Sequence, residues 1–180
     1  MFGVEMNIFL SHSRYNNLYN FLQPNKPKDI GNYATLVQRP GFRKQIHVGD
    51  AEFSNLIHVF DKLGNDFMNT VRPLLEELLD NYRVLYYSGQ LDIIVAYPMS
   101  VSMYNSLNFS AAGEYRNATR VPWYVDGELA GYMKSAGNFT EVLVRNAGHM
   151  VPMDQPKWAF DLITRFTSGN LLKSRNKSNV

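Results

Sequence analysis

The chain has 180 residues, of which 45% are hydrophobic, with 18 Lys and Arg against 16 Asp and Glu and no Cys. This composition excludes an intrinsically disordered chain, a disulfide scaffold and a cysteine-ligated zinc site. The formal net charge of +2 comes from scattered cations, which argues against a nucleic-acid surface. No apolar run reaches the roughly 18 residues that a membrane helix needs.

The first third of the chain predicts short helices. Residues 1–32 are Asn-rich and carry a partial helical stripe that ends at Pro24, so we expect a helix followed by a loop. Between Tyr33 and Val48, Pro40 separates two short helical turns, because proline is tolerated at a helix start but not inside one.

The middle of the chain has the strongest periodicity. Apolar residues three and four apart from Phe67 to Leu79 predict an amphipathic helix, with a kink or restart at Pro73. The apolar run from Arg83 to Ser88 predicts a strand buried on both faces. A helix from about Pro98 to Leu107 is expected to follow.

The last third predicts a hairpin, a strand and a helix. Asp126-Gly127 suits a two-residue hairpin turn between runs at 122–125 and 128–135, because both turn positions need positive φ. The run from Phe139 to Arg145 predicts a second buried strand. Asp154 is expected to cap a final helix that ends at Gly169. Helices that alternate with buried strands predict an α/β fold.

Two loops place ionisable residues just beyond the ends of the predicted buried strands, where open α/β sheets gather catalytic groups. Asp92 follows the first strand and His149 follows the later one. A buried carboxylate next to an imidazole can fix its tautomer and stabilise the imidazolium during proton transfer. Gly148 is expected to let the second loop turn tightly. The alternatives are that Asp92 only accepts hydrogen bonds from its own turn and that His149 is an ordinary loop residue.

Metal and nucleotide cofactors are not expected. His12, His47 and His58 form no metal-binding spacing with His149, and no Gly-rich phosphate loop occurs.

Four Asn-x-Ser/Thr sequons occur, at Asn108, Asn117, Asn138 and Asn176, where about two are expected from the composition. They favour a secretory route. Residues 1–10 do not resemble a signal peptide, so we expect any targeting signal to lie upstream of Met1.

The loops around Asp92 and His149 resemble the end of the serine carboxypeptidase family, and specifically its vitellogenic carboxypeptidase-like branch. The resemblance rests on Arg83–Met99, with the run SGQLDIIVAYP, and on Asn146–Lys157, with the run GHMVPMDQP. Tyr33–Gly49 also resembles a segment of the family. So does Trp123–Ala136, where the family has a tryptophan-led strand and a Gly-Tyr pair.

The resemblance implies the C-terminal portion of an α/β-hydrolase sheet with flanking helices and a β-hairpin, the N-terminal half being absent. Residues 33–169 would belong to this domain, 1–32 to a possible cap remnant and 170–180 to a flexible tail. It also implies release of C-terminal amino acids from peptides and a lysosomal, vacuolar or extracellular location. Asp92 and His149 would be catalytic, and Met150 would line the substrate pocket, unless it is plain packing.

The nucleophile of the family has no counterpart in this sequence. The family places it in a Gly-x-Ser-x-Gly turn, and none of Ser88, Ser135 and Ser168 has both glycines. We therefore expect the chain to be inactive alone and to need the other half of the enzyme. Two alternatives stay open: a degenerate, non-enzymatic binding module, and an acyltransferase relative that uses the same triad.

Overall fold

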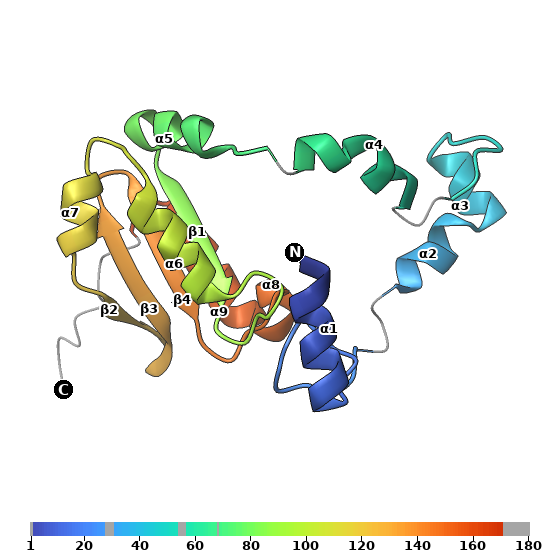
Figure 1. The fold of residues 1–180 in the computed structure, drawn as a ribbon, viewed down its shortest axis with the longest axis horizontal. Helices are drawn as coiled ribbons and strands as arrows, with labels where there is room; N and C mark the ends of the chain where they lie inside the picture. Colours follow the sequence, from blue (N-terminus) through green and yellow to red (C-terminus); the bar gives the residue numbers. More distant parts are fainter. Residues whose placement is uncertain (1, 28–30, 54–56, 68, 171–180) are drawn as a thin grey trace. The chain divides into compact units, whose positions relative to one another are not determined.

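The computed structural model describes residues 2–27, 31–53, 57–67 and 69–170 (Figure 1). They belong to two compact units, one made of Met1–Asn25 and Arg72–Val180 and the other of Lys26–Val71. None of the helices in these ranges combines the length and the apolar character needed to cross a bilayer. The predicted tail lies outside the described residues except for Asn170, as does the sequon at Asn176.

The Lys26–Val71 unit consists of short helices. Helices α2 (Asn32–Val37) and α3 (Pro40–Gln45) confirm the two helical turns predicted on either side of Arg39, with Pro40 in the first turn of α3. Helix α4 (Ile57–Phe67) was not predicted. No described residue of this unit is buried.

The other unit is built around a four-stranded sheet, in the order β1-β4-β3-β2. Strands β1 (Val84–Gly89) and β4 (Phe139–Val144) are parallel neighbours, and β2 (Val121–Val125) and β3 (Glu128–Ala136) form the predicted hairpin. Asp126 and Gly127 have φ of 51° and 85° at its turn, as the sequence indicated. Both predicted buried runs are therefore strands of one sheet.

Helices pack against both faces of this sheet and bury two apolar clusters. Helices α5 (Arg72–Asn81), α6 (Tyr97–Ser106) and α7 (Ala112–Asn117) enclose one cluster, while α8 (Val151–Asp154) and α9 (Pro156–Thr167) enclose the other. Side chains along β4 alternate between the two faces of the sheet. Phe139 lies in the first cluster, whereas Val142 and Val144 lie in the second. The unit also contains α1 (Phe2–Ser13), which ends well before Pro24.

Two expectations about individual residues are wrong. Strand β1 is not buried on both faces: Tyr86 and Tyr87 are each 38% exposed, because β1 lies at an edge of the sheet. Asp154 does not cap the last helix, whose N-cap is Gln155 without a side-chain cap. Asp154 instead ends α8, and its carboxylate accepts hydrogen bonds from other segments.

Candidate active site

Asp92 lies in the turn that follows β1, where its carboxylate is oriented by the backbone. Its Oδ1 accepts hydrogen bonds from the N–H groups of Ile94, at 2.8 Å, and Val95, at 3.2 Å. The residue is only 9% exposed. Oδ1 thus accepts hydrogen bonds from its own turn, as the alternative interpretation of Asp92 predicted. Oδ2 is directed toward the other loop and is available for a second contact.

His149 reaches the same edge of the sheet from β4. Because β1 and β4 are parallel and pair in register, with Gly89 opposite Val144, their carboxyl ends coincide. The backbone N–H of Leu91 donates to the carbonyl of Ala147 at 2.8 Å, which joins the two loops. A side chain at Gly89 would collide with the carbonyl oxygens of Ala147 and Gly148, so the glycine permits this close approach.

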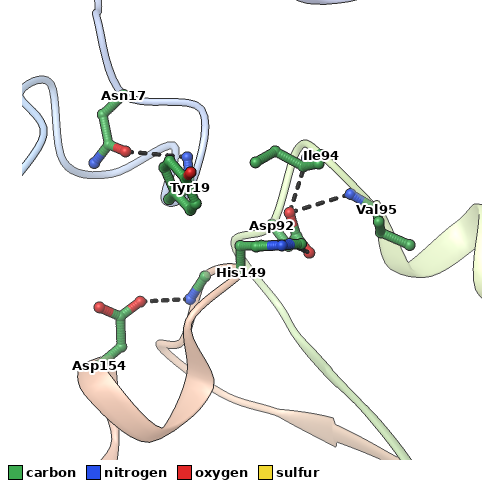
Figure 2. A network of polar contacts seen from close by, with 8 residues as sticks. Asn17, Tyr19, Asp92, Ile94, Val95, His149 and Asp154 are labelled. Carbon is green, nitrogen blue, oxygen red and sulfur yellow. Dashed lines mark hydrogen bonds and ion pairs between the residues drawn. The ribbon is translucent and has the colours of Figure 1, made fainter. Parts of the chain in front are cut away.

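The two side chains meet as the sequence predicted. His149 Nδ1 lies 2.9 Å from Asp92 Oδ2, and Figure 2 shows both residues pointing into the space between their loops. With the proton on Nδ1, the ring donates to the carboxylate and leaves Nε2 free to accept a proton. The His149 side chain is 34% exposed and Asp92 is buried, so this arrangement suits a general base held by an orienting carboxylate.

The sequence as a whole supports the same interpretation. A model of the serine carboxypeptidase family matches residues 7–169. The chain belongs to the serine carboxypeptidase family. The matched range contains the whole sheet and both loops of the Asp92–His149 pair.

Several relatives of this serine carboxypeptidase family member are similar over most of its length. It is 47% identical to the vitellogenic carboxypeptidase of Aedes aegypti over 162 residues, and 48% identical to the venom serine carboxypeptidase of Apis mellifera over 153 residues. These alignments cover 88% and 83% of this chain but 34% and 32% of the relatives. The chain therefore spans about a third of the length of the curated relatives it matches.

A solved structure shows the same fold. The prohormone-processing carboxypeptidase Kex1 of Saccharomyces cerevisiae superposes with a TM-score of 0.73 and 25% sequence identity, over 97% of this chain and 42% of Kex1. The predicted fold class, an α/β-hydrolase sheet with flanking helices, is confirmed by this match together with the four-stranded sheet.

Sequence reasoning missed a third segment beside the Asp92–His149 pair, the loop of residues 14–25 (Figure 2). The carbonyl of Tyr19 accepts the His149 N–H at 2.6 Å, and the two rings pack edge to face with centroids 5.6 Å apart. Asn20 donates from Nδ2 to Asp154 Oδ2 at 3.0 Å. No local pattern could have shown this contact, because 134 residues separate the two partners.

The glycine before His149 has a different role from the one predicted. The left-handed residue of this loop is Asn146, with φ of 52°, and not Gly148. A side chain at Gly148 would instead collide with the carbonyl of Tyr19. Gly148 therefore allows the loop of residues 14–25 to approach His149.

The remaining candidate residues are distributed over the unit. Met150 directly follows His149 and is exposed. Ser135 Oγ donates to Thr140 Oγ1 at 2.9 Å, near the start of β4, whereas His149 follows its end, so the structure does not pair this serine with the imidazole. A hollow of about 190 Å³ lined by Arg83, Ser135 and Asn138 also lies at that far end. Among the described residues, no three His, Asp or Glu side chains gather as a metal site.

Proposed function

We propose that this chain supplies the general base, His149, and the orienting carboxylate, Asp92, of a serine-type carboxypeptidase that releases C-terminal amino acids from peptides. The observation that carries the proposal is the 2.9 Å contact between Nδ1 and Oδ2. The membership of the chain in the family supports the choice of reaction.

The proposed chemistry assigns one role to each atom. His149 Nε2 accepts the proton of a serine hydroxyl as that oxygen attacks the terminal peptide carbonyl, and later returns the proton to the departing amino group. Asp92 Oδ2 holds the Nδ1–H and stabilises the imidazolium between these steps. Met150, exposed and next to the base, is proposed to contact the substrate side chain.

The nucleophile is proposed to come from another polypeptide segment. No serine of the 180 residues lies in a Gly-x-Ser-x-Gly sequence, and a base without a nucleophile forms no acyl-enzyme. The chain alone should release no terminal amino acid from a blocked dipeptide at acidic or neutral pH, and a fluorophosphonate should leave it unlabelled. Release by the purified chain would contradict this part of the proposal.

The roles of Asp92 and His149 can be tested in a chimera. This chain replaces the matching third of the Aedes aegypti relative, whose remaining sequence supplies the other segments. The chimera should release C-terminal amino acids. His149→Ala should lower kcat by about 10⁶-fold, and Asp92→Asn by about 10⁴-fold, as in other Ser-His-Asp enzymes.

The control for the chimera is His58→Ala, which removes an exposed histidine on α4. This variant should keep full activity. An active chimera in which His149→Ala behaves like His58→Ala would overturn the assignment of the base.

A secretory route is proposed from the sequons. Asn108 and Asn117 are exposed, whereas Asn138 is partly buried and donates from Nδ2 to the carbonyl of Leu79 at 3.1 Å. At the surface, Asn117 also donates from Nδ2 to the carbonyl of Gly113 at 2.9 Å. The exposure of Asn108 and Asn117 is compatible with glycosylation, whereas at Asn138 the glycan would have to displace a partly buried side chain. Expression behind a secretion leader should give a deglycosylation mass shift that Asn108→Gln and Asn117→Gln each reduce.

The two alternative functions differ in what they need from the site. A binding module has no chemical use for an oriented Asp92–His149 pair, so activity of the chimera would exclude it. An acyltransferase uses the same pair but passes the acyl group to an acceptor other than water. Product analysis of the active chimera separates the two reactions.

A further inference from the structure

The backbone around His149 is held from outside its own loop. Only four residues, 145–148, separate β4 from His149, and two consecutive N–H groups find their partners on other segments. Gly148 donates to Asp154 Oδ2 at 2.7 Å, and His149 donates to the carbonyl of Tyr19 at 2.6 Å. The position of the imidazole is therefore set by Asp154 and Tyr19 as well as by Asp92.

Asp154 and the loop of residues 14–25 are themselves joined. The oxygen of Asp154 that accepts from Gly148 also accepts from Asn20 Nδ2, at 3.0 Å. Asn20 is buried, and its Oδ1 accepts from the N–H of Leu22 at 3.1 Å, so its amide has one orientation. A buried amide is costly unless its groups are paired. Breaking the Asn20–Asp154 hydrogen bond would leave the buried amide unpaired, so the two side chains are held in contact.

Shape enforces the same arrangement. A side chain at Gly148 would collide with the carbonyl of Tyr19 and with Cβ of Asn20. The Tyr19 ring packs edge to face against the His149 ring at an interplanar angle of 65°. The imidazole is thus hydrogen-bonded to Asp92 at Nδ1, and the Tyr19 ring packs against it.

We propose that Tyr19, Asn20 and Asp154 form a histidine clamp, a set of positioning residues that keeps the His149 Nδ1–H directed at Asp92. This inference rests on the proposed Asp92–His149 function and adds to it three residues that act through the position of His149. It assigns Asp154 a role in positioning His149 rather than in capping the last helix. It also makes the loop of residues 14–25 a positioning segment for the proposed base.

The test reads the imidazole of His149 directly. The full 180-residue chain is labelled with ¹⁵N, and His149 is assigned by loss of its signals in His149→Gln. The wild-type chain should show a downfield Nδ1–H proton and the Nδ1-protonated tautomer, because the tautomer follows the hydrogen bond that the ring makes.

Variants of the clamp should change that signature while the sheet stays folded. Asp154→Ala should make the Nδ1–H exchange with water about tenfold faster or lose its signal, because local opening frees the ring. Asn20→Ala should act in the same direction and more weakly. Asp154→Asn keeps an acceptor oxygen and should restore the wild-type signature.

The matched control is Asn138→Ala. It removes another contact between remote segments of the same unit, the 3.1 Å bond to the Leu79 carbonyl, at the other end of the sheet. A merely structural role for the clamp predicts equal effects of Asn138→Ala and Asn20→Ala on the His149 signal, whereas positioning predicts an effect of Asn20→Ala alone.

The outcomes separate the two proposals. A wild-type chain without the Nδ1–H signal, or one whose signal is unchanged in Asp92→Asn, would overturn the Asp92–His149 pair and the clamp with it. A wild-type signal that persists unchanged in folded Asn20→Ala and Asp154→Ala would overturn the clamp alone. If Asp154→Ala fails to fold, Asn20→Ala decides the question.

Discussion

The two compact units of the chain treat their apolar residues differently. The sheet unit, Met1–Asn25 with Arg72–Val180, buries two clusters of apolar side chains, one on each face of its sheet. In the Lys26–Val71 unit no described residue is buried, and apolar side chains of α4 such as Phe60 and Leu63 are exposed. Both units thus contain helices, but among the described residues only the sheet unit buries side chains, and burial supplies the dominant favourable contribution to folding.

This difference explains where a precise site can exist. A proton-transfer pair must be held within a fraction of an ångström, and residues on a packed scaffold achieve that more readily than residues on isolated helices. Asp92 and His149 both follow strands of the sheet against which these apolar clusters pack. The comparison can be tested with paired substitutions, one in each unit.

The largest contrast is expected between two leucines. Leu162 of α9 is 0% exposed and Leu63 of α4 is 53% exposed. Leu162→Ala should lower the free energy of unfolding by about 2–5 kcal/mol through a cavity and lost burial, and Leu63→Ala by no more than about 0.5 kcal/mol. Urea unfolding followed by circular dichroism measures both. Equal losses would mean that the second unit is as well packed as the first.

Two glycines should respond in opposite directions. Gly89→Ala puts Cβ against the carbonyl oxygens of Ala147 and Gly148 and should cost about 1–3 kcal/mol of overpacking strain. Nothing lies within 4 Å of a Cβ built on Gly64 in α4, so Gly64→Ala should raise helicity and stabilise by up to about 1 kcal/mol. Thermal melts and far-ultraviolet circular dichroism check both signs, and destabilisation by Gly64→Ala would contradict the open surroundings described for α4.

Alkaline pH should weaken the sheet unit through two phenols, Tyr115, which is buried, and Tyr97, which is half-buried. Burial, and after it the neighbouring Glu141 carboxylate, raise the pKa of Tyr97 and Tyr115 above the ordinary value of about 10. Above pH 10 the unfolded chain releases these protons while the folded chain keeps them, so stability falls as pH rises. Urea midpoints measured from pH 8 to 11 should show the loss.

Tyr115→Phe provides the control for the alkaline experiment. The Tyr115 hydroxyl is buried without a hydrogen-bond partner among the described residues, so its removal should cost little at pH 7. The same variant should flatten the decline above pH 10. An unchanged pH dependence would show that Tyr115 ionises normally in the folded chain.

The smallest effect is expected at acidic pH, on the contact between α5 and residues 106–110. The hydrogen bond from Arg72, and after it the Asn108 N–H, lower the pKa of Glu76, and the Ser110 N–H lowers the pKa of Asp80. The stabilisation is present above about pH 4 and is lost as pH falls through the lowered values. Amide exchange at Asn108 and Ser110 should lose protection, and Asp80→Asn should remove the pH dependence at Ser110 only.

Much of the sheet unit could be predicted because its signals are local. The Asp126-Gly127 turn, the two apolar runs that became β1 and β4, and the ionisable residue after each are visible in short windows of sequence. Parallel pairing of β1 with β4 then brings Asp92 and His149 together, since carboxyl ends of parallel strands share one edge.

What could not be predicted depends on long-range neighbours. The exposure of Tyr86 and Tyr87 follows from the order of strands in the sheet, which periodicity does not encode. Asp154 has the position of a helix cap, and the contacts that its carboxylate makes with Gly148 and with the remote Asn20 show that it is used elsewhere. Helix α4 was missed because Gly64 and Asn65 interrupt its pattern with residues that disfavour helices.

The strand order has one practical consequence. In the chain, the β2–β3 hairpin lies between Asp92 and His149, but in the sheet it lies on the far side of β4, away from β1. Asp126 in this turn forms a surface ion pair with Lys157, and neither residue belongs to the loops that carry Asp92 and His149. A fluorescent tag or an inserted epitope at this turn would therefore report on the protein without altering the distance between the acid and the imidazole.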